Sequence, residues 1–133
     1  MESQRYSIGQ LARLSGVSVR AVRHYEQIGL LAAHRTAAGY RTFAPIALEH
    51  VQRIQVLLQN GFTLEQIQPV ASMFDIASKD RRDVCADVIA LYHEKLAELD
   101  GRIAALVTIR ERAAARLAFI EQQRREGGPF PPA

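Results

Sequence analysis

Side chains that can bind phosphate are concentrated between residues 18 and 41. They are Ser18, Arg20, Arg23, His24, Tyr25, Arg35, Tyr40 and Arg41. Arginine binds phosphate through paired N–H groups and reads guanine edges, and a helix start with its serine hydroxyl can also meet phosphate. Glu26 is the only acidic residue in this stretch. The pattern favours a surface that binds double-stranded DNA.

Several of these residues also have a purely structural interpretation. An arginine cluster can be a solvated face, Tyr25 can brace its helix, and Tyr40 can pack within its own hairpin. The structural and DNA-binding roles are compatible for both tyrosines.

The single cysteine, Cys85, is the second group with potential chemistry. One thiol per chain excludes an intramolecular disulfide and a zinc or iron–sulfur site that needs two thiolates from one chain. His93 lies eight residues further on, about 80° around a helix, which is poor geometry for a shared metal. We therefore expect Cys85 to be a small apolar side chain, and we expect no cofactor and no metal site. A metal or thiol-reactive effector at Cys85 remains the alternative.

An enzyme is not expected. No histidine or acid is placed to activate Cys85 as a nucleophile, and the sequence has no glycine-rich phosphate loop. Loss of turnover in a Cys85→Ser variant would be required to support catalysis.

The first 75 residues predict four helices and a small hairpin. Ser7 and Gln10 form a capping box before an apolar face of Ile8, Leu11, Ala12 and Leu14. Ser15-Gly16 ends that helix, and Ser18 caps a second one that runs to about residue 28. Residues 31–43 predict a β-hairpin around a turn at 36–39. Two short helices joined by a tight turn, with a hairpin beside them, are typical of a winged helix-turn-helix.

Further along the chain, Pro45 suits the first turn of a third helix, which ends at Asn60-Gly61. Thr63 and Gln66 form a second capping box, and Pro69 predicts a kink or an early end in the fourth helix.

Residues 80–125 predict one long coiled-coil helix. Apolar positions recur in alternating steps of four and three, and only Arg110 breaks the seam. The seam residues that we expect at a dimer interface are Ile89, Tyr92, Leu96, Leu99, Ile103, Leu106, Leu117 and Ile120. A helix of roughly 60 Å is too long for a chain of this size to bury, so a second copy is the simplest partner.

Charge and composition agree with this division. Residues 1–60 carry seven arginines and three glutamates, whereas residues 61–133 carry ten basic and eleven acidic residues. The chain has 133 residues, no run of 18 apolar residues and no apolar segment at its start. We therefore expect a cytoplasmic location without membrane contact.

The segment 6–67 closely resembles the MerR family of transcription regulators. Arg23-His24-Tyr25-Glu26-Gln27-Ile28-Gly29-Leu30 matches the family pattern R-x-Y-E-x-x-G-L, and Gly39-Tyr40-Arg41 matches its wing. The resemblance implies a homodimer with antiparallel coils that binds a pseudo-palindromic operator and distorts an over-long promoter spacer for RNA polymerase.

Carried over by position, the resemblance places Arg20 and Arg23 on the recognition helix. It places Tyr25, Arg35, Tyr40 and Arg41 near the DNA backbone and the wing. Metal sensors of the family carry a cysteine pair after the coil, but residues 107–133 contain neither cysteine nor histidine. A metal site of that kind is therefore incomplete here.

Together these features predict an all-α fold with a small β wing. We expect a winged helix-turn-helix DNA-binding domain over 1–75, an antiparallel coiled-coil dimerisation helix over 76–125, and a flexible tail over 126–133. The resulting function is sequence-specific transcription regulation. An architectural or excisionase-like DNA-binding protein is the alternative, which the long coil disfavours.

Overall fold

The computed structural model describes the backbone of residues 4–74 and 81–129, and the side chains of 4–71 and 86–129. It divides into two compact units, residues 1–86 and residues 87–133. The elements are β1 (Tyr6–Ser7), α1 (Ile8–Ser15), α2 (Val19–Gln27), β2 (His34–Arg35), β3 (Arg41–Phe43), α3 (Ile46–Gln59), α4 (Leu64–Ile67), a 3-10 helix η1 (Gln68–Phe74) and α5 (Arg81–Glu126). The predicted boundary at residue 75 falls outside the described residues.

The two helices of the helix-turn-helix begin and end through local hydrogen bonds. At the start of α1, the Gln10 backbone N–H donates to Ser7 Oγ, and the Ser7 backbone N–H donates to Gln10 Oε1. Gly16 ends α1 with a φ of 74°, a left-handed conformation that glycine adopts without strain. Ser18 then caps α2 by accepting a hydrogen bond from Ala21 N–H. The predicted capping residues are confirmed.

Replacing Ser7 by alanine is expected to lower the free energy of unfolding by about 1 kcal/mol, because one capping hydrogen bond of α1 is lost. Thermal unfolding of Ser7→Ala measures this loss. Ser7→Asp is the control, since a carboxylate also caps a helix, and it is expected to stay close to wild type. Equal losses in both variants would contradict a capping role.

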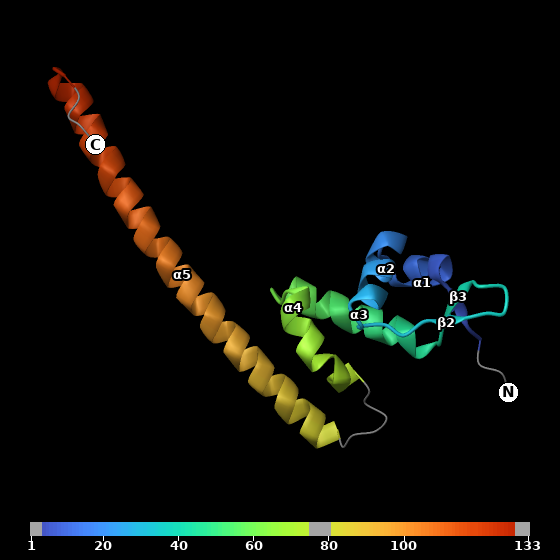
Figure 1. Cartoon of the computed structure of the whole chain (residues 1–133). Helices are drawn as coiled ribbons and strands as arrows, with labels where there is room; N and C mark the ends of the chain where they lie inside the picture. The colour runs from blue at the N-terminus through green and yellow to red at the C-terminus, as the bar shows by residue number, and fades with distance from the viewer. Residues whose placement is uncertain (1–3, 75–80, 130–133) are drawn as a thin grey trace. The chain divides into compact units, whose positions relative to one another are not determined.

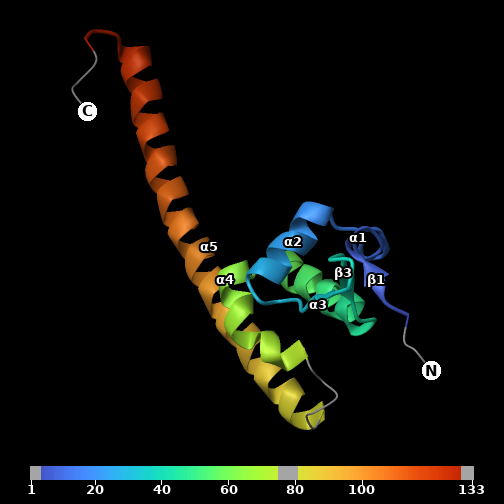
Figure 2. The same cartoon turned by 45° about the vertical axis from the view of Figure 1, so that its right-hand side comes forward.

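The predicted hairpin is confirmed as β2 and β3, and β1 extends it to a three-stranded antiparallel sheet. Its strand order is β1-β3-β2, with Tyr6 opposite Phe43 and His34 opposite Thr42. The two-residue strand β1 was not predicted, because it is too short to show an alternating pattern. In Figure 1 and Figure 2 the strands lie at one end of the first unit, beside α1 and α3.

A small core holds the helices to this sheet. Its fully buried members are Leu11, Val22, Phe43, Val51, Ile54 and Ile67. Leu14 was expected on the inner face of α1, but its side chain is 56% exposed. It follows Leu11 by three residues, so helical spacing alone would place it on the buried stripe, but it remains largely exposed in the structure.

The fourth helix ends early, as Pro69 predicts. Thr63 and Gln66 form the second capping box, α4 covers only Leu64–Ile67, and the chain continues as η1. The missing N–H of proline prevents continuation of the α-helical hydrogen bonds.

The helix α5 contains 46 residues and spans about 69 Å at 1.5 Å per residue. The predicted long helix is therefore confirmed, with its end one residue from the expected position. Large apolar side chains along it are exposed to solvent within the single chain. None of the described helices has an apolar stretch that could cross a lipid bilayer.

Candidate DNA-binding surface

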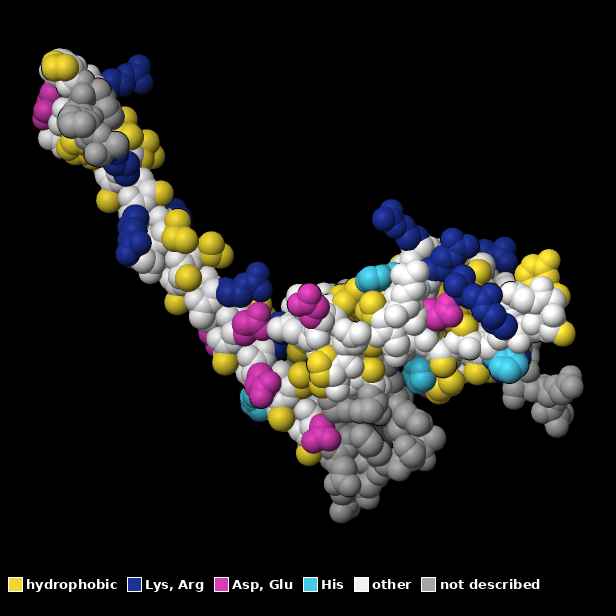
Figure 3. Space-filling model, viewed as in Figure 1, with side chains coloured by type: hydrophobic (Ala, Val, Ile, Leu, Met, Phe, Trp, Pro, Cys, Tyr) yellow, Lys and Arg dark blue, Asp and Glu magenta, His cyan; other side chains and the backbone are white. Residues whose placement is uncertain are grey.

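The outward face of α2 forms a shallow hollow with a polar and cationic lining. Ser18, Arg20, Ala21, Arg23, His24 and Gln27 line it. All six come from α2 or its cap, so the spacing of one helix positions them. In Figure 3, Lys and Arg side chains gather on this unit over α1 and α2. The structure thus brings four of the predicted DNA-binding residues, Ser18, Arg20, Arg23 and His24, to one surface.

Arg20 and Arg23 are exposed, and among residues 4–71 no ion pair holds either guanidinium. Serine at the helix start adds a hydroxyl, and the positive end of the helix dipole lies beside it. A helix that presents unpaired arginines and its own N-terminus is suited to the phosphates and base edges of a major groove.

Tyr25 corrects one part of the predicted surface. It was predicted as part of the surface that binds DNA, but only 6% of it is exposed, and it belongs to the core. The helical period explains the difference, because Tyr25 follows Val22 by three residues and therefore shares the buried stripe. Of its two proposed roles, the structure supports bracing the helix.

Burial also raises the pKa of the Tyr25 phenol above its usual value of 10.0 through desolvation. Because ionised Tyr25 is disfavoured in the fold, its contribution to stability is present below pH 10 and is lost as the pH rises through the raised pKa. Tyr25→Phe is expected to remove a tyrosine that ionises above pH 10 from an absorbance titration at alkaline pH. Loss of an early-ionising tyrosine would contradict this burial.

The wing, which we define as residues 34–43, ends in a turn with internal hydrogen bonds. Thr36 N–H donates to the Tyr40 carbonyl at 2.8 Å, and Gly39 N–H donates to the Thr36 carbonyl at 2.9 Å. Arg35 Nη1 donates to the Gly39 carbonyl at 3.1 Å. Tyr40 is 74% exposed at this turn, so the structure presents both Arg35 and Tyr40 to solvent.

Arg41 is placed differently from the other predicted DNA-binding arginines. Its Nε lies 2.8 Å from Glu26 Oε1 of α2, at a distance of an ion pair. The orientation of the N–H does not meet hydrogen-bond geometry, and both atoms are shielded from solvent. The prediction that Arg41 faces DNA did not anticipate this intramolecular partner.

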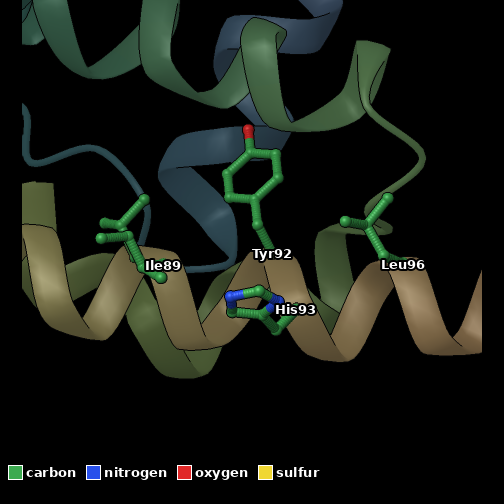
Figure 4. Close-up of a pocket in the computed structure, with 5 residues that line it drawn as sticks. Ile89, Tyr92, His93 and Leu96 are labelled. Carbon is green, nitrogen blue, oxygen red and sulfur yellow. The ribbon is translucent and has the colours of Figure 1, made fainter.

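The predicted seam residues all lie on α5. Ile89, Leu96, Ile103, Leu106 and Leu117 are each more than half exposed, Ile120 is 37% exposed, and Tyr92 and Leu99 are intermediate. Figure 4 shows Ile89, Tyr92 and Leu96 on one side of α5, with His93 in front of the helix. Figure 3 shows hydrophobic side chains recurring along the helix.

Sequence reasoning missed part of this apolar surface. Val107, Ile109 and Phe119 are also exposed, and the Arg116 guanidinium lies over the Phe119 ring at 5.1 Å. Val107 and Ile109 follow seam position Leu106 by one and three residues, so a search for apolar residues beside the seam would have found them.

Cys85 lies within α5, but its side chain is outside those that the structure describes. Among the described residues, no three His, Cys, Asp or Glu side chains form a group that could hold a metal ion. The effector hypothesis for Cys85 therefore stays a prediction.

Two family models match the chain, one over the helix-turn-helix and wing and the other from α3 into α5. The MerR helix-turn-helix regulatory protein model matches residues 6–73, and a model described as MerR DNA binding matches residues 48–113. The chain belongs to the MerR family. The matched ranges contain α1, α2, the wing, and α5 as far as residue 113.

Several relatives of this MerR-family chain are transcription regulators. The regulator HmrR of Rhizobium leguminosarum bv. viciae is 31% identical over 104 residues, covering 78% of each protein. HmrR of Sinorhizobium medicae is 38% identical over 101 residues, covering 75% of this chain and 66% of that protein. The chain thus spans about two thirds of the length of the latter relative.

Solved structures agree on the fold. The N-terminal part of the Bacillus subtilis multidrug transporter activator, MtaN, is 32% identical with a TM-score of 0.59, covering 82% of this chain and 97% of that one. The regulator HiNmlR, solved bound to promoter DNA, has a TM-score of 0.55 at 24% identity, covering 92% of this chain and 94% of that one. At that identity the likeness to HiNmlR shows the fold alone.

Proposed function

We propose that this MerR-family chain is a homodimeric transcription regulator that binds promoter DNA through the outward face of α2. The observation that carries the proposal is the exposed row of Ser18, Arg20, Arg23 and His24 on the second helix of a helix-turn-helix. HiNmlR, a regulator with this fold, binds promoter DNA.

Each residue has a distinct role in the proposed contact. Arg20 and Arg23 bind phosphate oxygens or guanine edges, and Ser18 with the start of α2 binds a further phosphate. Arg35 and Tyr40 of the wing contact the backbone beside the α2 site. This division separates contacts that position the protein from contacts that read sequence.

Two copies of α5 pair along the seam that begins at Ile89 and ends at Ile120. The apolar side chains exposed in one chain support this pairing, because a long apolar stripe in water is stable only when a partner covers it. Antiparallel pairing relates two DNA-binding units by a twofold axis, which matches a pseudo-palindromic operator. The dimer then distorts an over-long promoter spacer so that RNA polymerase engages both promoter elements.

Selection of duplexes from a random-sequence library by the full-length chain tests the proposed function. We expect enrichment of an inverted repeat, bound by two chains per duplex in native mass measurements. Retention of DNA without an enriched sequence would instead support the alternative of an architectural or excisionase-like DNA-binding protein.

We also propose that Cys85 is dispensable for DNA binding. Cys85→Ser is expected to bind the selected duplex with wild-type affinity, and both wild type and variant are expected to show the native mass that their sequences give for a dimer without bound ligand. Some relatives are heavy-metal-dependent regulators, one of them 36% identical. A mass excess that appears in the wild-type dimer and disappears in Cys85→Ser would overturn the proposal and identify an effector site.

A further inference from the structure

We infer that Arg41 and Glu26 form a strut that fixes the orientation of the wing relative to α2, and that Arg41 is a positioning residue and not a phosphate ligand. The inference rests on the proposed DNA-binding function and adds a determinant of it. Three observations support it.

The first observation is the isolation of Glu26. It is the only acidic residue between positions 3 and 48, a segment that contains six arginines. It also lies in the last turn of α2, where the helix dipole disfavours a carboxylate. A free carboxylate beside a DNA-binding face would repel phosphate, so Glu26 requires a cationic partner at this position.

The second observation is the geometry of the pair. The Nε–Oε1 distance is 2.8 Å, and the side chains of Arg41 and Glu26 are only 30% and 21% exposed. Both facing atoms are inaccessible to solvent. Arg41 Nε is therefore held by Glu26, and this contact fixes where the guanidinium lies. Separation of the pair would leave a shielded carboxylate without its cation.

The third observation is the anchoring of the strand that carries Arg41. At the next residue, Arg5 Nε donates to Thr42 Oγ1 at 2.9 Å, and Thr42 Oγ1 donates to the His34 carbonyl at 3.0 Å. These hydrogen bonds hold β3 in the sheet, and the Arg41 side chain reaches from β3 to Glu26 of α2. Motion of the wing relative to the recognition helix therefore requires separation of Arg41 from Glu26.

The strut and the phosphate-contact interpretation make opposite predictions for Glu26. If Arg41 binds phosphate, removal of Glu26 frees that arginine and removes a repulsive charge, so DNA binding becomes tighter. If the pair is a strut, removal of either partner displaces Arg35 and Tyr40 from the DNA backbone, so DNA binding becomes weaker.

A charge-reversal cycle in the full-length chain tests the strut. The variants are Glu26→Arg, Arg41→Glu and the double variant, and the probe is a fluorescein-labelled duplex selected by the wild-type chain. We expect each single variant to bind at least about tenfold more weakly and the double variant to recover to within about threefold of wild type. Reversal of the Glu49–Arg53 pair of α3 is the control and is expected to show little coupling, because its atoms are 3.7 Å apart and the Glu49 side chain is 58% exposed.

Two results would overturn the strut. One is a double variant that binds as weakly as Arg41→Glu alone, and the other is a Glu26→Arg variant that binds more tightly than wild type. Thermal unfolding of every variant ensures that binding is measured on folded protein. Where a charge-reversal variant does not fold, Glu26→Gln replaces it and is expected to bind DNA more weakly than wild type. Binding by Glu26→Gln that equals or exceeds that of wild type would contradict the strut. If wild type itself selects no sequence, the proposed function fails instead of the strut.

Discussion

Leu106→Asp is expected to convert the protein into a monomer that no longer binds operator DNA. Leu106 is 64% exposed in the single chain, so the substitution leaves no cavity in the monomer. In a paired seam it buries a carboxylate from each chain in an apolar interface. We expect a cost of about 3 kcal/mol or more, which is roughly a hundredfold in the dimer Kd. Sedimentation over a range of concentrations measures the change.

Thr108→Asp is the matched control for the dimer interface. It adds the same charge two residues away, at an exposed position outside the seam. It is expected to remain a dimer. A Leu106→Asp protein that still sediments as a dimer would show that the seam is assigned to the wrong face of α5.

Arg23→Ala is expected to weaken operator binding from about 30-fold to more than about 10,000-fold, because the substitution removes a DNA interaction worth about 1–3 kcal/mol in each of two protomers, or about 2–6 kcal/mol per dimer. If Arg23 binds phosphate, the slope of log K against log salt also becomes shallower by about 0.9 for each phosphate that the variant no longer neutralises. If it reads a guanine edge, the slope changes little and selectivity at one base pair is relaxed. Fluorescence anisotropy at several salt concentrations distinguishes these two modes of binding.

Arg112→Ala removes the same charge from an exposed position on α5 and controls for net charge. It is expected to bind the operator nearly as well as wild type. Equal effects of the two substitutions would contradict a specific role for α2.

Local features of the fold were predictable from the sequence. Ser7 with Gln10, and Thr63 with Gln66, cap helices through residues three apart, so short sequence patterns contain the whole interaction. Pro69 likewise ends α4 through its own missing N–H. The row of Ser18, Arg20, Arg23 and His24 follows from the period of one helix.

Features that depend on tertiary contacts were not predictable in the same way. Tyr25 lies in phase with Val22, but it is amphipathic, so its spacing alone does not show that it is buried. The strand β1 exists because β3 lies beside it, and Arg41 pairs with Glu26 fifteen residues earlier. A single sequence shows the charges of such a pair without showing that they meet.

For α5, the sequence predicted both the helix and its apolar seam, but neither sequence nor single chain contains the partner. The exposed side chains at Ile103 and Leu106 are therefore the link between a confirmed helix and a proposed dimer.

Hydroxyl-radical footprinting of the wild-type chain on its selected duplex tests the central proposal most directly. Cleavage is suppressed wherever protein covers the sugar–phosphate backbone, so the pattern reports the number and symmetry of bound units. A dimer with two α2 faces predicts two protected patches related by the twofold axis of an inverted repeat. A single asymmetric patch, or uniform protection along the duplex, would contradict a homodimer that reads its operator through α2.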